Sequence, residues 1–287
     1  MTHALRAVAQ WPVRTAAGAV VGPSGILETF GDVRRPFALA SVTKPLAALA
    51  VLVAVEEGAL ELEDPPVPAV QQIVPGASVR HLLSHAGGLA ADRLVLAAMP
   101  GTRRIYSNAG IEVLADQVAR TTGMPFAGYF REAVAEPLAL TATTTGARAS
   151  RDGISTVADL ARVVTELLES TGLLHPTTLA DATSVQFPGL RGVLPGYGPQ
   201  AENDWGLGFE IKAAKTPHWT GAANSAGTFG HFGQAGTMLW VDPDARLGLV
   251  ALADRPFDDW ARVAWPALSD AVLTTYGNGP AVTTSRP

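Results

Sequence analysis

The alternation of apolar and polar residues predicts strands near both ends of the chain and helices between them. Two short strands are expected over residues 17–30, around a turn at Gly22-Pro23-Ser24-Gly25. Further along, strand-like segments separated by Gly or Asp-Pro-Asp turns recur at 205–213, 227–232, 237–242 and 247–254. We therefore expect one sheet assembled from the two chain ends, with a helical insertion between them.

The middle of the chain carries helical patterns instead. Residues 41–57 are rich in Ala, Leu and Val, apolar on nearly every side and stopped by Gly58, which predicts a central, buried helix. Further helices are expected at 78–84, 109–122, 126–135, 156–170 and 258–276.

The predicted fold class is α/β, in the form of an α+β sandwich with two domains. Residues 1–45 and 196–287 are expected to form a discontinuous sheet domain, and residues 46–195 a mostly helical domain. An active site is expected at the interface between them.

Composition excludes several classes of function. Of the 287 residues, 47% are apolar and 16% are charged, which suffices for a packed core and is not typical of disorder. The net charge of -5 lacks the basic surplus typical of nucleic-acid binding. The absence of cysteine excludes disulfides, thiolate catalysis and cysteine-ligated zinc.

Neither a membrane span nor an export signal is expected. The longest apolar run, residues 45–55, is shorter than the about 20 residues that a bilayer requires. Gln10, Trp11 and Pro12 interrupt the apolar pattern near the N-terminus, so it does not read as a secretory signal. We therefore expect a cytoplasmic protein.

A serine and a lysine stand at the start of the central helix. Ser41 and Lys44 are three residues apart and therefore lie on one helix face. A serine hydroxyl needs a base or a cation beside it to act as a nucleophile, and a helix N-terminus adds positive potential. The alternative is a capping serine followed by a solvated lysine. The apolar helix favours catalysis, because a bare charge there is costly without partners.

Tyr106 and Asn108 precede another predicted helix. A tyrosine whose pKa is lowered by a nearby lysine can act as a general base. An asparagine amide can hold that lysine and orient a substrate carbonyl. The alternative for this pair is a loop tyrosine beside a helix cap.

A glycine-rich strand is expected around His231. Glycines at 230, 233 and 236 indicate that another backbone approaches this strand closely. Its edge can supply a backbone N–H group for an oxyanion hole. Taken alone, His231 is better explained as a core or surface histidine.

These three motifs, in this order and spacing, resemble those of the penicillin-recognising serine hydrolases, in the branch of class C β-lactamases and family VIII esterases. The family pattern of Ser-x-x-Lys, Tyr-x-Asn and Lys/His-x-Gly stands here as Ser41/Lys44, Tyr106/Asn108 and His231/Gly233. The resemblance covers roughly residues 15–270 and includes the stretches FALASVTKP (37–45), VRHLLSHAGGL (79–89) and YSNAGIEVLADQVARTTG (106–123). It implies a β-lactamase/transpeptidase-like fold, with an antiparallel sheet flanked by helices and an added helical domain.

The resemblance also implies catalytic roles. Ser41 would form an acyl-enzyme, and Tyr106 would act as general base in acylation and in activating the deacylating water. Lys44 would lower the pKa of Ser41 or Tyr106, or shuttle the proton. No Glu-x-x-x-Asn element follows Tyr106, so the tyrosine mechanism is preferred to one that primes water with a glutamate.

Substrate-binding roles follow from the same resemblance. Asn108 would bond Lys44 and the substrate, and His231 with Gly233 would form the third motif, in which β-lactamases have lysine in place of histidine. The backbone N–H groups of Ser41 and Gln234 would form the oxyanion hole. No cofactor is expected.

Two departures from the family pattern favour esters over penicillins. Only 17 residues separate Gly88 from Tyr106, and the chain between Thr144 and Gly153 is also short, so we expect an open, shallow cleft. A histidine at 231 is mostly neutral at pH 7, unlike a lysine, and would hold a substrate carboxylate less firmly.

We therefore expect a serine hydrolase of the carboxylesterase type, acting on a small-molecule ester or amide without nucleic-acid or membrane partners. The alternatives are a β-lactamase or D-alanyl carboxypeptidase/amidase, and a non-catalytic binding protein with the same fold. The oligomeric state is left open. His81 and His85 are four residues apart on a helix, but they lack a third ligand, and no metal site is expected.

Overall fold

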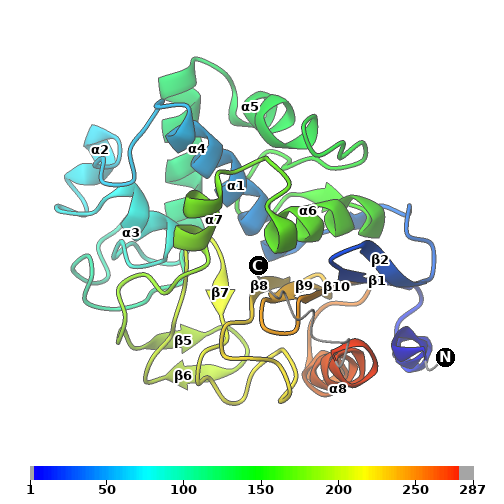
Figure 1. The fold of residues 1–287 in the computed structure, drawn as a ribbon. Coiled ribbons are helices and arrows are strands. Elements are labelled where there is room, and N and C mark those ends of the chain that lie inside the picture. Colours follow the sequence, from blue (N-terminus) through cyan, green and yellow to red (C-terminus); the bar gives the residue numbers. More distant parts are fainter. Residues whose placement is uncertain (1–2, 278–287) are drawn as a thin grey trace, which may run out of the picture.

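A six-stranded antiparallel sheet joins the two ends of the chain (Figure 1). The computed structural model describes residues 3–277. The strand order is β2-β1-β10-β9-β8-β7. The strands are β1 (Ala16–Gly22), β2 (Gly25–Phe30), β7 (Glu210–Ile211), β8 (Phe229–Gly233), β9 (Thr237–Asp242) and β10 (Leu247–Ala253). The predicted sheet from both chain ends is confirmed, and the α+β class with it.

Helices cover both faces of this sheet (Figure 1). On one face, α8 (Asp259–Tyr276) packs on β10 and on the N-terminal 3-10 helix η1 (Ala4–Gln10). On the other face, α6 (Val157–Glu169) packs on β1, β9 and β10. The remaining helices are α1 (Thr43–Glu56), α2 (Pro68–Gln71), α3 (Val79–Leu83), α4 (Asn108–Thr122), α5 (Phe126–Phe130) and α7 (Pro176–Ala182).

The helix α1 lies at the centre of the core, as its sequence predicts. Every residue from Thr43 to Ala54 is buried, and the helix packs against α4, α5 and β8. Burying one Val or Leu side chain contributes about 1.5–3 kcal/mol, so this helix is a large source of stability. Lys44, the second residue of this helix, is buried with it.

Some predicted elements differ from the structure. The expected strand over 205–213 is wrong except for Glu210–Ile211. Gly206 and Gly208 explain the difference, because a Cβ at these positions would lie 2.1 Å from the Ala182 carbonyl oxygen and from the Ala48 Cβ respectively. This chain segment therefore packs as an irregular stretch against α7 and α1. The expected helix over 126–135 divides into α5 and a π-helical turn at Arg131–Ala135.

Two small sheets complete the fold. The pair β3 (Phe37–Ala38) and β4 (Ile154–Ser155) connects the chain just before Ser41 to the segment before α6. The hairpin of β5 (Gly192–Leu194) and β6 (Gly198–Gln200) was not expected from the sequence. The division into sheet and helical domains stays a prediction. None of the described helices has the length and apolar character that a membrane span requires.

A buried ion pair supports the edge strand β7. Glu210 accepts hydrogen bonds from Lys215 and from Trp219 Nε1 at 2.8 Å, and its carboxylate lies 2.9 Å from His218 Nε2. The carboxylate and the ammonium are both inaccessible to solvent, with exposed fractions of 2% and 0%. Burial alone would raise the pKa of Glu210, but the neighbouring His218 and Lys215 outweigh it and hold that pKa well below its usual range.

Removing one member of this pair is expected to destabilise the protein strongly. Lys215→Met should lower the free energy of unfolding by about 3 kcal/mol, because Glu210 then stays buried without its main countercharge. Lys212→Met is the matched control, since Lys212 is half-buried and bonds the carbonyl oxygens of Ala222 and Asn224. Urea denaturation measures both, and equal losses in the two variants would contradict the expectation.

Candidate active site

Ser41 lies in a tight turn between β3 and α1. The turn is a 3-10 helix over Ala40–Val42, and Ala40 has a φ of 46°, in the left-handed region that residues with a Cβ rarely adopt. Thr43 holds this turn in place, because its hydroxyl donates to the Ala40 carbonyl at 2.6 Å and accepts from the Gly153 N–H at 2.9 Å. The conformation of the serine is therefore set by the neighbouring polypeptide.

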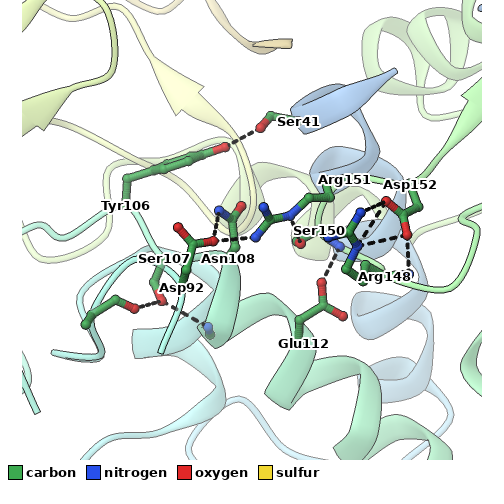
Figure 2. Close-up of polar contacts among 12 residues, drawn as sticks. Ser41, Asp92, Tyr106, Ser107, Asn108, Glu112, Arg148, Ser150, Arg151 and Asp152 are labelled. Atoms are coloured by element: carbon green, nitrogen blue, oxygen red, sulfur yellow. Dashed lines mark hydrogen bonds and ion pairs between the residues drawn. The ribbon is translucent and has the colours of Figure 1, made fainter. Parts of the chain in front are cut away.

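The structure brings together the three residues predicted to be catalytic. The Tyr106 hydroxyl donates to Ser41 Oγ at 2.7 Å (Figure 2), and Lys44 Nζ lies 3.1 Å from the same oxygen. Lys44 Nζ also donates to the carbonyl oxygen of Ser150 at 2.9 Å and lies 4.6 Å from the centre of the Tyr106 ring. Helix α1 thus supplies the lysine and the loop before α4 supplies the tyrosine.

Burial changes the acid–base behaviour of Lys44. Desolvation and the positive charge of Arg151 lower its pKa from 10.5 to about 7, against the opposing effects of Glu112 and Asp92. A substantial fraction of Lys44 is therefore a neutral amine at pH 7. Its side chain is fully buried.

Burial has the opposite effect on Tyr106. It raises the pKa of the phenol well above its ordinary value, although the hydrogen bond to Ser41 and the charge of Arg151 act in the other direction. The hydroxyl therefore keeps its proton at neutral pH. The Tyr106 ring packs among the rings of His85, His231 and Trp205, at centroid distances of 4.8, 5.8 and 5.8 Å.

His231 is a neutral histidine within β8. Its Nδ1 lies 2.6 Å from the Phe232 carbonyl oxygen, so Nδ1 carries the proton and donates it. Burial and the nearby Lys44 lower the pKa of His231 from 6.5 to about 3. Because Nδ1 holds the proton, Nε2 presents a lone pair, and this atom has no hydrogen-bond partner among the described residues. The ring therefore brings no positive charge to the site.

The end of β8 passes close to Ser41. A Cβ added to Gly233 would lie 2.2 Å from the Leu39 carbonyl oxygen and 3.2 Å from the Ser41 nitrogen. Within residues 3–277, no hydrogen bond runs from the N–H group of Ser41 or of Gln234 to a side chain or to the backbone of a turn or loop. The predicted contact between this strand and the serine turn is present.

Asn108 has a different partner from the one expected. Its side-chain amide donates to Asp92 at 2.9 Å, and Arg151 bonds the same carboxylate (Figure 2). Lys44 bonds the Ser150 carbonyl instead. The physical reason is the Asp92–Arg151 pair, because a carboxylate is a strong acceptor for the Asn108 amide N–H and fixes the side chain beside that pair.

A small pocket opens beside the serine. It has a volume of about 170 Å³. Its walls are mainly apolar and aromatic and include Leu194, Pro195, Trp205 and Phe232, together with Glu210 and the predicted site residues Ser41, Tyr106, His231 and Gln234. The hairpin β5–β6 provides Leu194 and leads into Pro195, so a wall that the sequence did not reveal closes part of the expected open cleft.

The sequence did not predict the structural roles of three further residues. The Arg104 guanidinium is buried and donates to the carbonyl oxygens of Ser84, Gln186 and Asn203 at 2.6, 2.6 and 3.0 Å, two residues before Tyr106. His85 accepts the Ser107 N–H at 3.2 Å. His81 stacks on Phe187 at 4.2 Å. Backbone carbonyl partners leave no trace in a sequence motif, which is why Arg104 was not recognised.

The model of the β-lactamase family matches residues 32–273 of the chain. The chain belongs to the β-lactamase family. A β-lactamase structure from Mycobacterium bovis is 55% identical, covers 96% of this chain and 99% of its own length, and superposes with a TM-score of 0.92. No curated protein matches the chain in sequence.

More distant members of the β-lactamase fold have other activities. Unliganded simvastatin synthase from Aspergillus terreus is 20% identical, with a TM-score of 0.79 and coverage of 96% of this chain and 97% of its own. The hydrolase EstCE1, described as having promiscuous acyltransferase activity, is 19% identical, with a TM-score of 0.74 and coverage of 94% and 96%. These two similarities establish the fold. By its family and its fold, the chain is therefore a serine hydrolase related to β-lactamases.

The close approach at Gly233 predicts a specific loss. Gly233→Ala should destabilise the protein by about 1–3 kcal/mol, because the new methyl group must push β8 away from the serine turn. It should also slow the labelling of Ser41 by a fluorophosphonate probe at least tenfold. Gly128→Ala in α5 is the control, since a Cβ there meets nothing within 4 Å. Labelling of both variants at the wild-type rate would contradict the assignment.

Proposed function

We propose that the protein is a carboxylesterase that hydrolyses small esters through an acyl-enzyme on Ser41. The observation that carries this proposal is the hydrogen-bonded chain Tyr106–Ser41–Lys44, with distances of 2.7 and 3.1 Å, around an apolar pocket. A nucleophile within hydrogen-bonding distance of a base is the arrangement that covalent acyl transfer requires.

Lys44 is the base in this proposal. As a neutral amine it accepts the Ser41 proton while Oγ attacks the ester carbonyl, and the new Oγ–C bond gives a tetrahedral intermediate. The bond to the alcohol then breaks, and the leaving oxygen takes the proton that Lys44 had accepted. The raised pKa of Tyr106 speaks against its role as the general base, which the resemblance had implied. Its hydroxyl instead donates to Oγ and stabilises the charge that develops there.

Deacylation reverses these steps with water in place of the alcohol. A water molecule gives its proton to Lys44 and attacks the acyl carbonyl, the bond to Oγ breaks, and Ser41 recovers a proton from Lys44. The N–H groups of Ser41 and Gln234 would hold the oxyanion in both steps, consistent with the close approach of β8 to the serine turn. We assign Asn108, His231 and Gly233 to the binding of the substrate.

The pocket favours an uncharged acyl group. Its lining is mainly apolar and aromatic, and the neutral His231 provides no cation for a substrate carboxylate. A positively charged partner would be the natural complement of the carboxylate of a penicillin. A β-lactamase remains the second candidate, because the 55% identical relative carries that name.

Ester hydrolysis should depend on Ser41. The purified protein is expected to hydrolyse p-nitrophenyl acetate and butyrate, and Ser41→Ala should lower kcat at least 1000-fold, because no acyl-enzyme can form. Intact-mass spectrometry should show an acyl adduct in the wild type only. The wild type is expected to turn over a chromogenic cephalosporin at least 100-fold less efficiently than the esters. Undiminished ester hydrolysis in the variant would refute the proposed function, and efficient cephalosporin turnover would favour the β-lactamase.

The rate should rise with pH through the titration of Lys44. Below its pKa of about 7 the amine is protonated and cannot accept the Ser41 proton, so kcat/KM should fall on the acid side with an apparent pKa near that value. Arg151→Gln should move this limb to higher pH, because Arg151 lowers the pKa of Lys44. A pH profile without an acid limb, or a shift to lower pH in the variant, would contradict Lys44 as the base.

A further inference from the structure

Helix α4 carries a carboxylate, that of Glu112, that bonds the peptide segment in contact with Lys44. Glu112 lies one helical turn after Asn108, on the same face of α4. Its two carboxylate oxygens accept the consecutive backbone N–H groups of Ala149 and Ser150, at 3.1 and 3.0 Å. Figure 2 shows the Glu112 carboxylate beside Ser150. A carboxylate that holds two amides with separate oxygens fixes the position and the orientation of that peptide segment.

The same peptide segment bears the acceptor for Lys44. The carbonyl oxygen of Ser150 receives Lys44 Nζ at 2.9 Å, and Ser150 is fully buried. Within residues 3–277, this carbonyl and Ser41 Oγ are the two hydrogen-bond partners of Nζ. The position of the amine beside the nucleophile therefore depends on where the Ser150 carbonyl is held.

Other contacts hold the residues that follow this peptide: Arg151 pairs with Asp92, and the Gly153 N–H donates to the Thr43 hydroxyl at 2.9 Å. The peptide itself belongs to an irregular turn in which Arg148 and Asp152 form an ion pair. The Arg148 side chain is 59% exposed, and exposed pairs of this kind contribute little to stability. The two hydrogen bonds to Glu112 are instead part-buried and charge-assisted. Within residues 3–277, Glu112 is the side chain that bonds the N–H groups of Ala149 and Ser150 directly.

We propose that Glu112 is a positioning residue for acyl transfer: it clamps the Ala149–Ser150 peptide so that the Ser150 carbonyl keeps Lys44 within reach of Ser41. The inference rests on the proposed function, because it assigns Lys44 a role in turnover. Glu112 does not touch the nucleophile and acts only through the peptide and through its charge.

The charge of Glu112 gives this role a distinct signature. The charged groups that act on Lys44 are Arg151, which lowers its pKa, and Glu112 and Asp92, which raise it. The other titratable neighbours, Tyr106 and the buried His85 and His231, are uncharged at neutral pH. Removal of the Glu112 charge therefore moves the titration of Lys44 to lower pH, which a merely structural role would not do.

The test measures the rate at which a fluorophosphonate labels Ser41, as a function of pH and by intact mass. Glu112→Gln should lower the plateau rate at least tenfold, because an amide group can accept only one of the two N–H groups, and should move the acid limb to lower pH. Glu112→Asp keeps the negative charge, but its shorter side chain cannot reach both N–H groups. It should therefore lower the plateau of the labelling rate and leave the acid limb of the pH profile at the same pH.

Asp116→Asn is the matched control on the same helix, since Asp116 is exposed and pairs with Arg120. It should label like the wild type. All variants are compared well below their melting temperatures, so that unfolding does not contribute. If Glu112→Gln retains either the wild-type plateau or the wild-type acid limb, the inference is overturned.

A crystal structure of Glu112→Gln gives a readout that does not depend on turnover. The Ser150 carbonyl should move out of hydrogen-bonding distance of Lys44 Nζ, and an unchanged contact of 2.9 Å would overturn the inference. If the fluorophosphonate does not label Ser41 in the wild type, the proposed function is refuted. The crystal structures of the wild type and of Glu112→Gln still test whether Glu112 holds the Ser150 carbonyl, so the two failures can be told apart.

Discussion

The burial of one amine governs the arrangement of this site. Lys44 lies inside an apolar helix with no exposed surface, where a permanent charge would be costly. Its hydrogen-bond partners within the described chain are a serine hydroxyl and a backbone carbonyl, neither of which carries a countercharge. The energetic consequence is a pKa lowered to about 7, which makes the amine available as a base. The stability of the fold and the reactivity of the serine therefore depend on the same buried helix.

Three elements must meet for this amine to act on a serine. The 3-10 turn and helix α1 that follows it bring Ser41 and Lys44, the loop before α4 brings Tyr106, and the end of β8 lies against the serine turn at Gly233. The sheet fixes β8, and α1 packs directly on it. The geometry of the site therefore depends on the packing between the sheet and the helices.

The sequence was sufficient to predict the parts of the site that are local or that form a motif. The spacing of Ser41 and Lys44 follows from helix geometry, and the resemblance to the family identified Tyr106 and the glycine-rich strand. Buried apolar helices and hairpins also leave periodic patterns, so α1, β1, β2, β9 and β10 were predicted within a few residues. Family membership follows from the same motifs and is confirmed by the match over residues 32–273.

What could not be predicted depends on contacts between distant backbone groups. Lys44 bonds a carbonyl 106 residues away, and Glu112 bonds amides 37 and 38 residues away, which any residue type except proline at 149 and 150 could provide. The strand predicted over 205–213 failed for a related reason, because Gly206 and Gly208 are required by close packing against other elements. Asn108 found a carboxylate on a neighbouring loop, a partner that no spacing rule indicates.

The protonation state of Lys44 can be observed directly. The chain contains three lysines, Lys44, Lys212 and Lys215, so a protein labelled with ¹³C at the lysine ε-carbon gives three signals in an NMR titration. The signal that is absent from Lys44→Met should titrate with a pKa of about 7. A Lys44 signal that stays in its protonated position up to pH 9 would contradict the central claim that a neutral lysine activates Ser41.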